Sequence, residues 1–535
     1  MLKTYPPVTV VRVQAAPPSL QDNTADLDRL RAALTESLPQ HISTLPVRIP
    51  FECMTEMAAG FRNADFTGYA LIHILEGRIE AVHFFPEKPE MLPALALDLG
   101  STHLEATLLD LLTGATLARG NALNRQVRYG EDILSRIHFA GQKEGLAVLQ
   151  KAAVDSINGL IEALSKEAGV HPAEIHAVAV SGNTTMIHLL LGINPYHICR
   201  EPYIPLVNAP DPFPAWKIGL KTHCRAVVRV LPGRGSYFGG DLIAGILATG
   251  LDQTEEISML IDVGTNAEVV MGNSGWLIAC AGAAGPALEG GVAKMGMRAA
   301  AGAVDHVVID QDDQDNWQLR WRTIGDAPPL GICGSGLIDL VAELYLARVI
   351  DLRGKFQTEF PGQSEAHSRF VRERLLEMNG ELAFIVVATE EAGNDAPDVP
   401  IMLTQIDLDA MMRSKAAMYA ILVTLTGQVG IEFSELKHIY VAGAFGKHID
   451  PHQAITLGML PDLPVSVFQP VGNSSLRGAE MILLDHTAYA RAQEIAQKIT
   501  YVELNVNQDF MIRFSGSRFI PHTDPSLFPS VPNFR

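Results

Sequence analysis

Two stretches of the chain alternate between apolar runs and a short polar turn in the same order. In residues 259–271, MLIDVGTNAEVVM, an apolar run reaches Asp262, a turn follows at Gly264, and a second apolar run begins. Residues 95–106, LALDLGSTHLEA, repeat this order around Asp98. Each pattern predicts a β-hairpin with the acid at the end of its first strand. The recurrence of one unit at long range predicts two related halves.

The remaining periodicity predicts an α/β chain with a small separate unit at residues 1–90. The Pro-rich stretch 195–235 lacks periodicity, and we expect a long ordered excursion there, with partner contact as a hypothesis. Helices are predicted at 22–37, 133–140, 146–168, 186–191, 242–249, 337–349, 407–428 and 477–498, strands at 8–13, 175–180, 437–441, 502–505 and 510–514, and hairpins at 69–84 and 307–321.

The two acidic hairpin turns have the residue types that bind a phosphate and a metal ion. Glycine lets backbone N–H groups approach an anion, and Asp98 and Asp262 could hold hydrated Mg²⁺. Two such hairpins could face each other across a cleft and hold a triphosphate between them. The alternative is two unrelated β-turns, and the repeated order of residues disfavours it. The predicted phosphate contacts are Gly100, Ser101, Thr102, Gly264, Thr265 and Asn266.

Two polar turns in the first half precede predicted helices, where backbone N–H groups favour an anion. After the strand at 175–180, the turn is either a ligand contact through Gly182, Asn183 and Thr184 or a simple N-cap, with equal support. Asp241 either caps the helix at 242–249 or orients water near the phosphates. The cap is the favoured interpretation.

Two glycine-rich turns in the second half predict contacts with adenosine. The turn at 331–336, GICGSG, runs straight into a predicted helix, and its three glycines favour nucleotide contact over a packing turn. No long strand precedes it and no ribose acid follows at the expected distance, so it does not predict a dinucleotide fingerprint. The predicted contacts are Gly331, Gly334, Ser335, Gly336, Gly443 and Gly446.

Length and charge set the class of protein. At 535 residues the chain is too long for one core, and several domains are expected. A net charge of −19 disfavours nucleic acid and anionic membranes as partners. The N-terminus lacks the pattern of a secretory signal, and no apolar stretch of about 18–20 residues predicts a transmembrane helix. We therefore expect a cytoplasmic location.

The five cysteines do not predict a disulfide framework or an iron–sulfur cluster. Cys53, Cys199, Cys224, Cys280 and Cys333 are scattered, and none forms a C-x-x-C pair. Small buried hydrophobic side chains are the favoured interpretation of each. Histidines 41, 73 and 83 lack the spacing of metal ligands and are expected to be structural.

Together these motifs resemble the actin-like ATPase superfamily of sugar kinases, acetate kinase and heat-shock chaperones. More narrowly, the chain is similar to the reductive activators of corrinoid proteins. The resemblance covers roughly residues 92–530 and rests on Asp98–Thr102, SGNTTM at 181–186, 239–241, IDVGTNAE at 261–268, AGPALEG at 284–290, GICGSG at 331–336 and VAGAFG at 441–446. It implies a duplicated, two-lobed α/β fold with ribonuclease H-like halves: a linker-like domain at 1–91, a first lobe at 92–255 and a second lobe at 256–535.

The resemblance also implies a function. Members use ATP, with Mg²⁺, to help return an inactive Co(II) corrinoid on a partner protein of a methyltransferase system to Co(I). Asp98, Asp262 and Asp241 would be the catalytic acids, and the first two would hold the metal. Many members carry a ferredoxin domain, whereas this chain has no C-x₄-C-x₂-C motif. A separate low-potential electron donor is therefore expected, and a homodimer is left open. The alternatives are a small-molecule kinase and a nucleotide-gated scaffold without catalysis.

Overall fold

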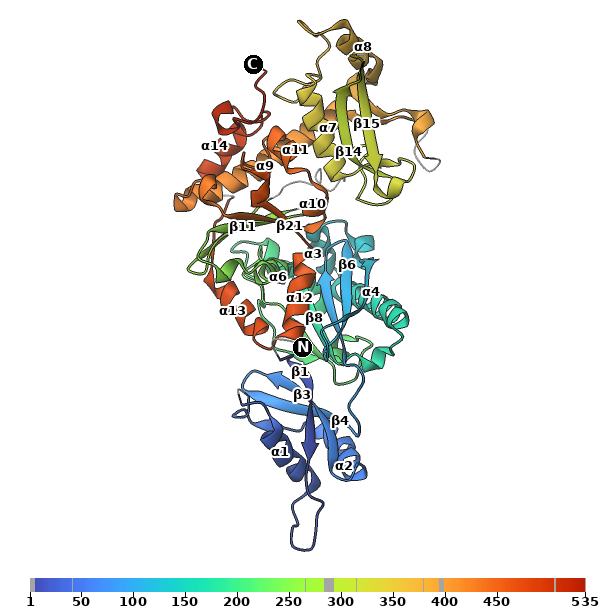
Figure 1. Cartoon of the computed structure of the whole chain (residues 1–535), viewed down its shortest axis with the longest axis vertical. Coiled ribbons are helices and arrows are strands. Elements are labelled where there is room, and N and C mark those ends of the chain that lie inside the picture. The colour runs from blue at the N-terminus through green and yellow to red at the C-terminus, as the bar shows by residue number, and fades with distance from the viewer. Residues whose placement is uncertain are drawn as a thin grey trace. The chain divides into compact units, whose positions relative to one another are not determined.

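The computed structural model describes residues 5–40, 42–264, 266–282, 293–313, 315–378, 380–393, 399–504 and 507–534, with backbone only at 444, 445 and 447 (Figure 1). The chain forms two compact units. Unit 1 comprises Met1–Ala248 and Ser474–Gln497, and unit 2 comprises Thr249–Asn473 and Lys498–Arg535. The chain therefore leaves unit 1 in its middle and returns to it for one pair of helices.

The first 85 residues of unit 1 form a four-stranded sheet in the order β1-β3-β4-β2. The predicted hairpin is confirmed as β3 and β4, which pair antiparallel. Helix α1 begins four residues later than predicted, because Asp22 lies in a turn that precedes the helix. Its carboxylate accepts a hydrogen bond from Thr24 N and forms an ion pair with Arg29 of the helix. The elements are β1 (Val8–Gln14), α1 (Asp26–Ser37), β2 (Val47–Arg48), α2 (Met54–Asn63), β3 (Thr67–Leu75) and β4 (Arg78–Phe85).

A six-stranded sheet in the order β7-β6-β5-β8-β10-β9 forms the centre of unit 1. Strands β7, β6 and β5 are antiparallel neighbours, and β8 runs parallel to both β5 and β10. Strand β8 is buried along its whole length, which explains its continuous apolar sequence. The bounds are β5 (Pro93–Leu99), β6 (His103–Asp110), β7 (Thr116–Leu123), β8 (Ala177–Gly182), β9 (Phe213–Pro214) and β10 (Val227–Val230).

Helices cover this sheet. Helix α4 packs on β6 and β7, and α12 packs on β5 and β8; Figure 1 shows the two helices flanking the strands. Helix α4 ends at Gly169, whose positive φ closes its last turn. The helices of unit 1 beyond residue 91 are α3 (Ile133–Ala140), α4 (Gly145–Ala168), α5 (Thr184–Leu191), α6 (Gly240–Thr249), α12 (Ser474–Leu484) and α13 (Ala488–Lys498).

Five strands of the unit 2 sheet repeat the arrangement of the first sheet, whereas the sixth strand lies next to β10 in unit 1 and next to β13 in unit 2. The strands of the unit 2 sheet run β21-β20-β11-β12-β13-β22. As in unit 1, a three-stranded antiparallel meander is followed by two parallel strands, here β20 and β21. The duplicated α/β fold expected from the two hairpins is therefore confirmed. The bounds are β11 (Ser258–Val263), β12 (Ala267–Gly272), β13 (Leu277–Gly282), β20 (His438–Ala442), β21 (Phe468–Gly472) and β22 (Ile499–Tyr501).

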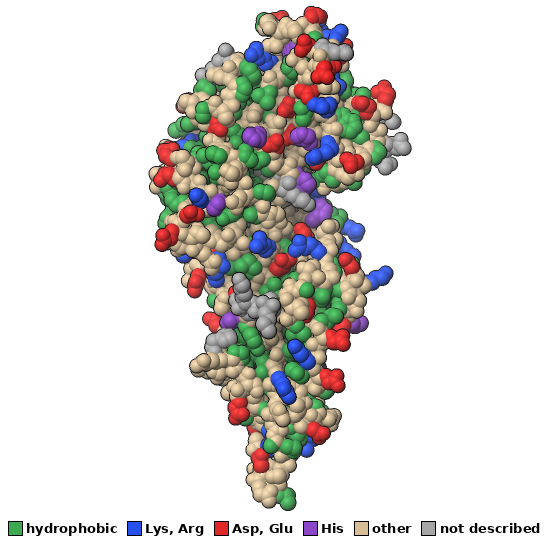
Figure 2. All heavy atoms as spheres, in the orientation of Figure 1, with side chains coloured by type: hydrophobic (Ala, Val, Ile, Leu, Met, Phe, Trp, Pro, Cys, Tyr) green, Lys and Arg blue, Asp and Glu red, His purple; other side chains and the backbone are tan. Residues whose placement is uncertain are grey.

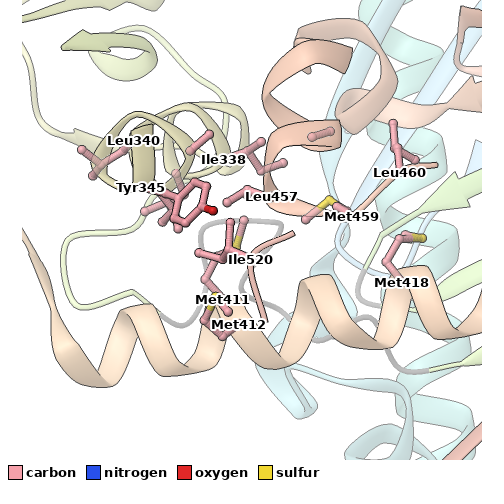
Figure 3. Close-up of a cluster of buried hydrophobic side chains, with 14 of the residues drawn as sticks. Ile338, Leu340, Tyr345, Met411, Met412, Met418, Leu457, Met459, Leu460 and Ile520 are labelled. Carbon is pink, nitrogen blue, oxygen red and sulfur yellow. The ribbon is translucent and has the colours of Figure 1, made fainter. Parts of the chain in front are cut away.

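The rest of unit 2 consists of two small sheets and several helices around one apolar core. Figure 3 shows part of this core, where side chains of α7, α9 and α11 meet Met459, Leu460 and Ile520. The sheets are β14 (Ala303–Gln311), β15 (Trp317–Thr323) and β16 (Gly331–Ile332), and β17 (Leu375–Met378), β18 (Glu381–Val387) and β19 (Ile401–Thr404). The helices are α7 (Gly334–Leu346), α8 (Glu365–Arg374), α9 (Gln405–Val429), α10 (Gly443–His448), α11 (Pro451–Leu457) and α14 (Gln508–Gly516).

Four predicted elements are wrong. The strand predicted at 502–505 lies earlier, at Ile499–Tyr501 (β22), because these residues pair with β13, and residues 502–504 are not in a strand. The helix predicted at 477–498 is two helices, α12 and α13, because the backbone N–H of His486 donates to Tyr5 O instead of continuing the helix. Residues 510–514 are helical rather than extended, and the side chain of Asn507 caps the start of α14. The stretch 195–235 is not only an excursion, because it contains the buried strand β10.

The distribution of charged side chains and the hydropathy of the helices are those of an ordinary folded protein. On the face shown in Figure 2, acidic and basic side chains are interspersed rather than gathered into one single-sign patch. Within the described ranges, every helix is too short or too polar to span a bilayer.

Candidate functional site

The first acid lies at the carboxyl edge of the unit 1 sheet. Asp98 is the penultimate residue of β5 and lies beside Ser181 of β8 in the parallel register. The hydroxyl of Ser475, in the first turn of α12, donates to Asp98 Oδ1 at 2.7 Å and lies 2.8 Å from Ser181 Oγ. The carboxylate is therefore held by a side chain that follows it by 377 residues in sequence.

The turn after Asp98 has a tightly fixed backbone. A Cβ on Gly100 would lie 2.3 Å from the carbonyl oxygen of His103, so a larger residue does not fit. The buried Asn124, at the end of β7, donates its side-chain amide to Gly100 O at 2.9 Å and its backbone N–H to Thr102 O at 2.8 Å. Ser101 and Thr102 are half-buried. The turn can therefore present backbone N–H groups and hydroxyls in a set geometry.

The turn at the end of β8 is predicted to be either a ligand contact or an N-cap, and the structure shows the N-cap for Asn183. Asn183 caps α5, because its side chain accepts from Met186 N at 2.9 Å. The Thr184 hydroxyl donates to Gly235 O at 3.1 Å. Both side chains thus have partners within unit 1, and Gly182 packs against Leu99 of the neighbouring strand. The capping interpretation accounts for Asn183; ligand contact by these three residues stays a prediction.

Asp241 is not the N-cap of its helix, so the favoured interpretation is wrong. Helix α6 already begins at Gly240, because Gly239 and Gly240 pack closely against Asn183 and Leu231. Asp241 lies in the first turn, where its Oδ1 accepts from Leu242 N at 2.9 Å. A carboxylate in the first turn is favoured by the helix dipole.

The second acid occupies the equivalent position in unit 2. Asp262 is the penultimate residue of β11, lies opposite Glu268 on β12 and is next to Ala442 of the parallel strand β20. In unit 1, Asp98 likewise lies opposite a glutamate, Glu105. The turn is closed by Gly264 N, which donates to Asn266 O at 2.8 Å. Thr265 lies outside the described residues.

The glycine after β20 approaches the second acid. Gly443 has φ +77°, which a residue with a Cβ rarely adopts, and a Cβ there would lie 3.4 Å from Asp262 Oδ1. Gly446 is needed for packing, because a Cβ would lie 2.2 Å from Val441 O. The structure thus brings Asp262 and Gly443 together.

Close packing explains two glycines of the 331–336 turn. A Cβ on Gly336 would lie 2.2 Å from Val304 O on β14, and one on Gly331 would lie 2.8 Å from Met295 O. Ser335 is buried, with its Oγ 3.3 Å from Cys333 Sγ, and Gly334 is buried as well. The packing turn, the disfavoured alternative, therefore accounts for Gly331 and Gly336, and adenosine contact stays a prediction. The motif at 284–290 lies outside the described residues.

Sequence reasoning missed two residues of the first site. Asn124 and Ser475 hold the turn and the acid, but both lie far from Asp98 in sequence. A signal for Ser475 was present: residues 472–478, GNSSLRG, follow the strand β21 and open a helix. This strand, glycine, polar residue and helix order is the same one that marked 181–185.

Comparison with known proteins supplies the family. Residues 2–83, 93–254 and 256–532 match the regions described as the RACo linker region, the RACo middle region, and the C-terminal domain of RACo, the ASKHA domain. The last match covers more than half of the chain. The chain belongs to this family. Its C-terminal domain is an ASKHA domain, so the expected actin-like ATPase fold and the resemblance to corrinoid activators are confirmed.

Three relatives extend this result. The corrinoid activation enzyme RamQ of Eubacterium limosum is 31% identical over 449 residues, 83% of this chain and 73% of RamQ. The Co(II) methylated amine-specific corrinoid protein reductase of Methanosarcina barkeri is 26% identical over 432 residues, 76% and 72% of the two chains. A solved structure, the reductive activator for corrinoid, iron-sulfur protein, is 37% identical with a TM-score of 0.87, covering 99% of this chain and 81% of its own.

Proposed function

We propose that this protein uses ATP to help return an inactive Co(II) corrinoid, bound to a protein of a methyltransferase system, to Co(I). The RACo family membership and the names of the relatives support this proposal. The observation that carries it is the pair of acids at equivalent positions of a duplicated sheet, Asp98 in unit 1 and Asp262 in unit 2. Such a duplication offers a phosphate turn in each half.

The residues of both turns fit Mg²⁺ and a nucleotide phosphate. Carboxylates at strand ends can hold a hydrated Mg²⁺, and backbone N–H groups of the glycine turns can donate to phosphate oxygens. When bound, ATP supplies the free energy of its hydrolysis. Asp98 and Asp262 would hold the metal, and Asp241 would orient water. The phosphate contacts would be Gly100, Ser101, Thr102, Gly182, Asn183, Thr184, Gly264, Thr265 and Asn266, and the adenosine contacts Gly331, Gly334, Ser335, Gly336, Gly443 and Gly446.

An external low-potential donor would supply the electron. The five cysteines of this sequence contain no cluster motif, and in the structure they are free thiols. Burial raises the pKa of the Cys280 thiol, which disfavours the thiolate that a metal ligand requires. The protein's own part is then to bind nucleotide and partner, and to couple the two binding events.

Steady-state ATP hydrolysis tests this proposal. Slow hydrolysis that rises when a Co(II) corrinoid protein is added supports an activase. Phosphorylation of a metabolite without a partner indicates a kinase, and nucleotide binding without turnover indicates a scaffold. Asp262→Asn should abolish the stimulated rate. Asp313→Asn, which removes the same charge from the exposed turn between β14 and β15, is the matched control and should keep it.

A further inference from the structure

Three side chains linked by hydrogen bonds lie at the start of the first proposed phosphate turn. Ser475 Oγ is 2.7 Å from Asp98 Oδ1 and 2.8 Å from Ser181 Oγ. A serine hydroxyl carries one proton and two acceptor lone pairs, and a carboxylate only accepts. The Ser475 proton is therefore given to Asp98, so the Ser181 proton must make the second bond. The order of donation is Ser181 to Ser475 to Asp98.

Both serine hydroxyls of this hydrogen-bonded set are buried. Ser181 is fully buried and Ser475 is 5% exposed, so each hydroxyl depends on protein partners rather than bulk water. Ser475 lies in the first turn of α12, where the helix dipole also favours the Asp98 carboxylate. A hydrogen bond to one carboxylate oxygen restrains the rotation of the carboxyl group. The orientation of that group decides which direction the acid offers to a cation.

The neighbouring serine provides an internal comparison. Ser474 is 2% exposed, yet its Oγ has no hydrogen-bond partner among the described residues. Both serines lie in the first turn of the same helix and are buried to a similar degree. Only Ser475 contacts the acid. Both substitutions remove a buried hydroxyl from the same turn of the helix, whereas only the one at Ser475 removes a hydrogen bond to Asp98.

We propose that Ser475 is a positioning residue for Asp98, with Ser181 as its support, and that it sets the Mg²⁺-dependent part of nucleotide binding. This inference rests on the proposed function, in which Asp98 holds the metal. Side chains that orient a metal ligand typically change metal affinity by about 10- to 100-fold when they are removed. Ser475 is expected to act through the carboxylate and not through nucleotide contact of its own.

Calorimetric titration separates these roles. Mg·ATP, and ATP with excess EDTA, are titrated into the wild-type protein, Ser475→Ala and Ser474→Ala. Ser475→Ala should raise the Kd for Mg·ATP by about tenfold and leave the Kd for metal-free ATP within about twofold. Ser474→Ala should leave both constants within about twofold of the wild type, because it removes no hydrogen bond.

Each other result contradicts the inference. An unchanged Mg·ATP affinity in Ser475→Ala overturns it, and an equal loss with and without Mg²⁺ shows a structural role instead. If Ser475→Ala does not fold, Ser181→Ala decides: it should weaken Mg·ATP binding by about threefold without affecting metal-free ATP. A wild-type protein that binds no Mg·ATP overturns the proposed function itself.

Discussion

At the scale of single residues, each proposed phosphate turn depends on an acid held at a strand end. Asp98 is held by Ser475, and Asp262 lies beside the glycine Gly443, where a Cβ would come within 3.4 Å of its carboxylate. The two acids thus share a position but not their immediate neighbours.

Asp262→Ala tests the second turn. It should weaken Mg·ATP binding at least about tenfold, since a lost charge-assisted contact costs on the order of 1.5–3 kcal/mol. Calorimetry provides the measurement, and Asp313→Ala on an exposed turn is the control. An affinity equal to that of the wild type would remove Asp262 from the site.

At the scale of elements, two helical glycines have opposite roles. A Cβ on Gly478 of α12 would lie 2.4 Å from the Cβ of Ala244 on α6, so the helices meet there without room for a methyl group. A Cβ on Gly159 of α4 would lie 3.8 Å from its nearest neighbour, Arg125. Both lie inside helices, where alanine is intrinsically favoured over glycine.

The two substitutions to alanine should therefore change stability in opposite directions. Gly159→Ala should stabilise the protein by up to about 1 kcal/mol through helix propensity. Gly478→Ala should destabilise it by about 1–3 kcal/mol through overpacking against α6. Chemical denaturation followed by circular dichroism measures both. A stabilised Gly478→Ala would show that α6 and α12 are not in close contact.

The elements also show how far sequence reasoning reaches. The hairpins around Asp98 and Asp262 follow from the apolar runs on either side of a polar turn, and the sheet topology confirms them. The break between α12 and α13 does not, because it depends on the hydrogen bond from His486 N to Tyr5 O, a partner 481 residues away. The contact between Ser475 and Asp98 could not be predicted for the same reason, because the two residues are 377 positions apart. The local pattern at 472–478 marks the turn before α12 but does not indicate its partner.

A second kind of error came from short apolar runs. Residues 510–514, FMIRF, fit either a strand or a helix, and the cap by Asn507 decides for the helix. The three glycines of the turn at 331–336 predict contact with a ligand, whereas contacts with Val304 and Met295 explain Gly336 and Gly331. Glycine marks close approach, and sequence does not say whether protein or ligand is the neighbour.

At the scale of the whole molecule, histidines join the N-terminal sheet to the rest of unit 1. His73 of β3 and His176, just before β8, are buried. Burial lowers the pKa of each to about 3; Arg229 adds to the shift of His73, and neighbouring histidines add to both shifts. His176 and His223 have ring centroids 4.5 Å apart. Protonation would place positive charges in this junction.

The lowered pKa values of the two histidines determine how the stability of the fold depends on pH. Between pH 6.5 and 3 the unfolded chain binds protons at both histidines and the folded chain does not, so stability falls as the pH is lowered. Each group contributes about 1.4 kcal/mol per pH unit in this window. The difference between the melting temperatures at pH 7 and pH 5 should become smaller in His176→Gln, where His73 still contributes, whereas the exposed His197→Gln should retain the wild-type difference. An unaltered slope in His176→Gln would contradict this.

The electron's origin is also a property of the whole chain. Five scattered cysteines provide no cluster motif, so anaerobically purified protein should be colourless and contain no stoichiometric iron or sulfide. Metal analysis and visible absorption provide the test. Stoichiometric iron with visible absorption would reveal a redox centre in this protein and would contradict the expectation that the protein carries no cluster of its own.

The central claim is that this protein couples ATP to the reduction of a corrinoid on a partner protein. ATP can shift a conformational equilibrium of this protein only if it binds the two conformations with different affinity. The most direct measurement is the anaerobic appearance of the Co(I) spectrum in a mixture of Co(II) corrinoid protein, low-potential reductant, this protein and ATP. Co(I) should form only when all four are present. Equal formation without ATP, or without this protein, would contradict the account.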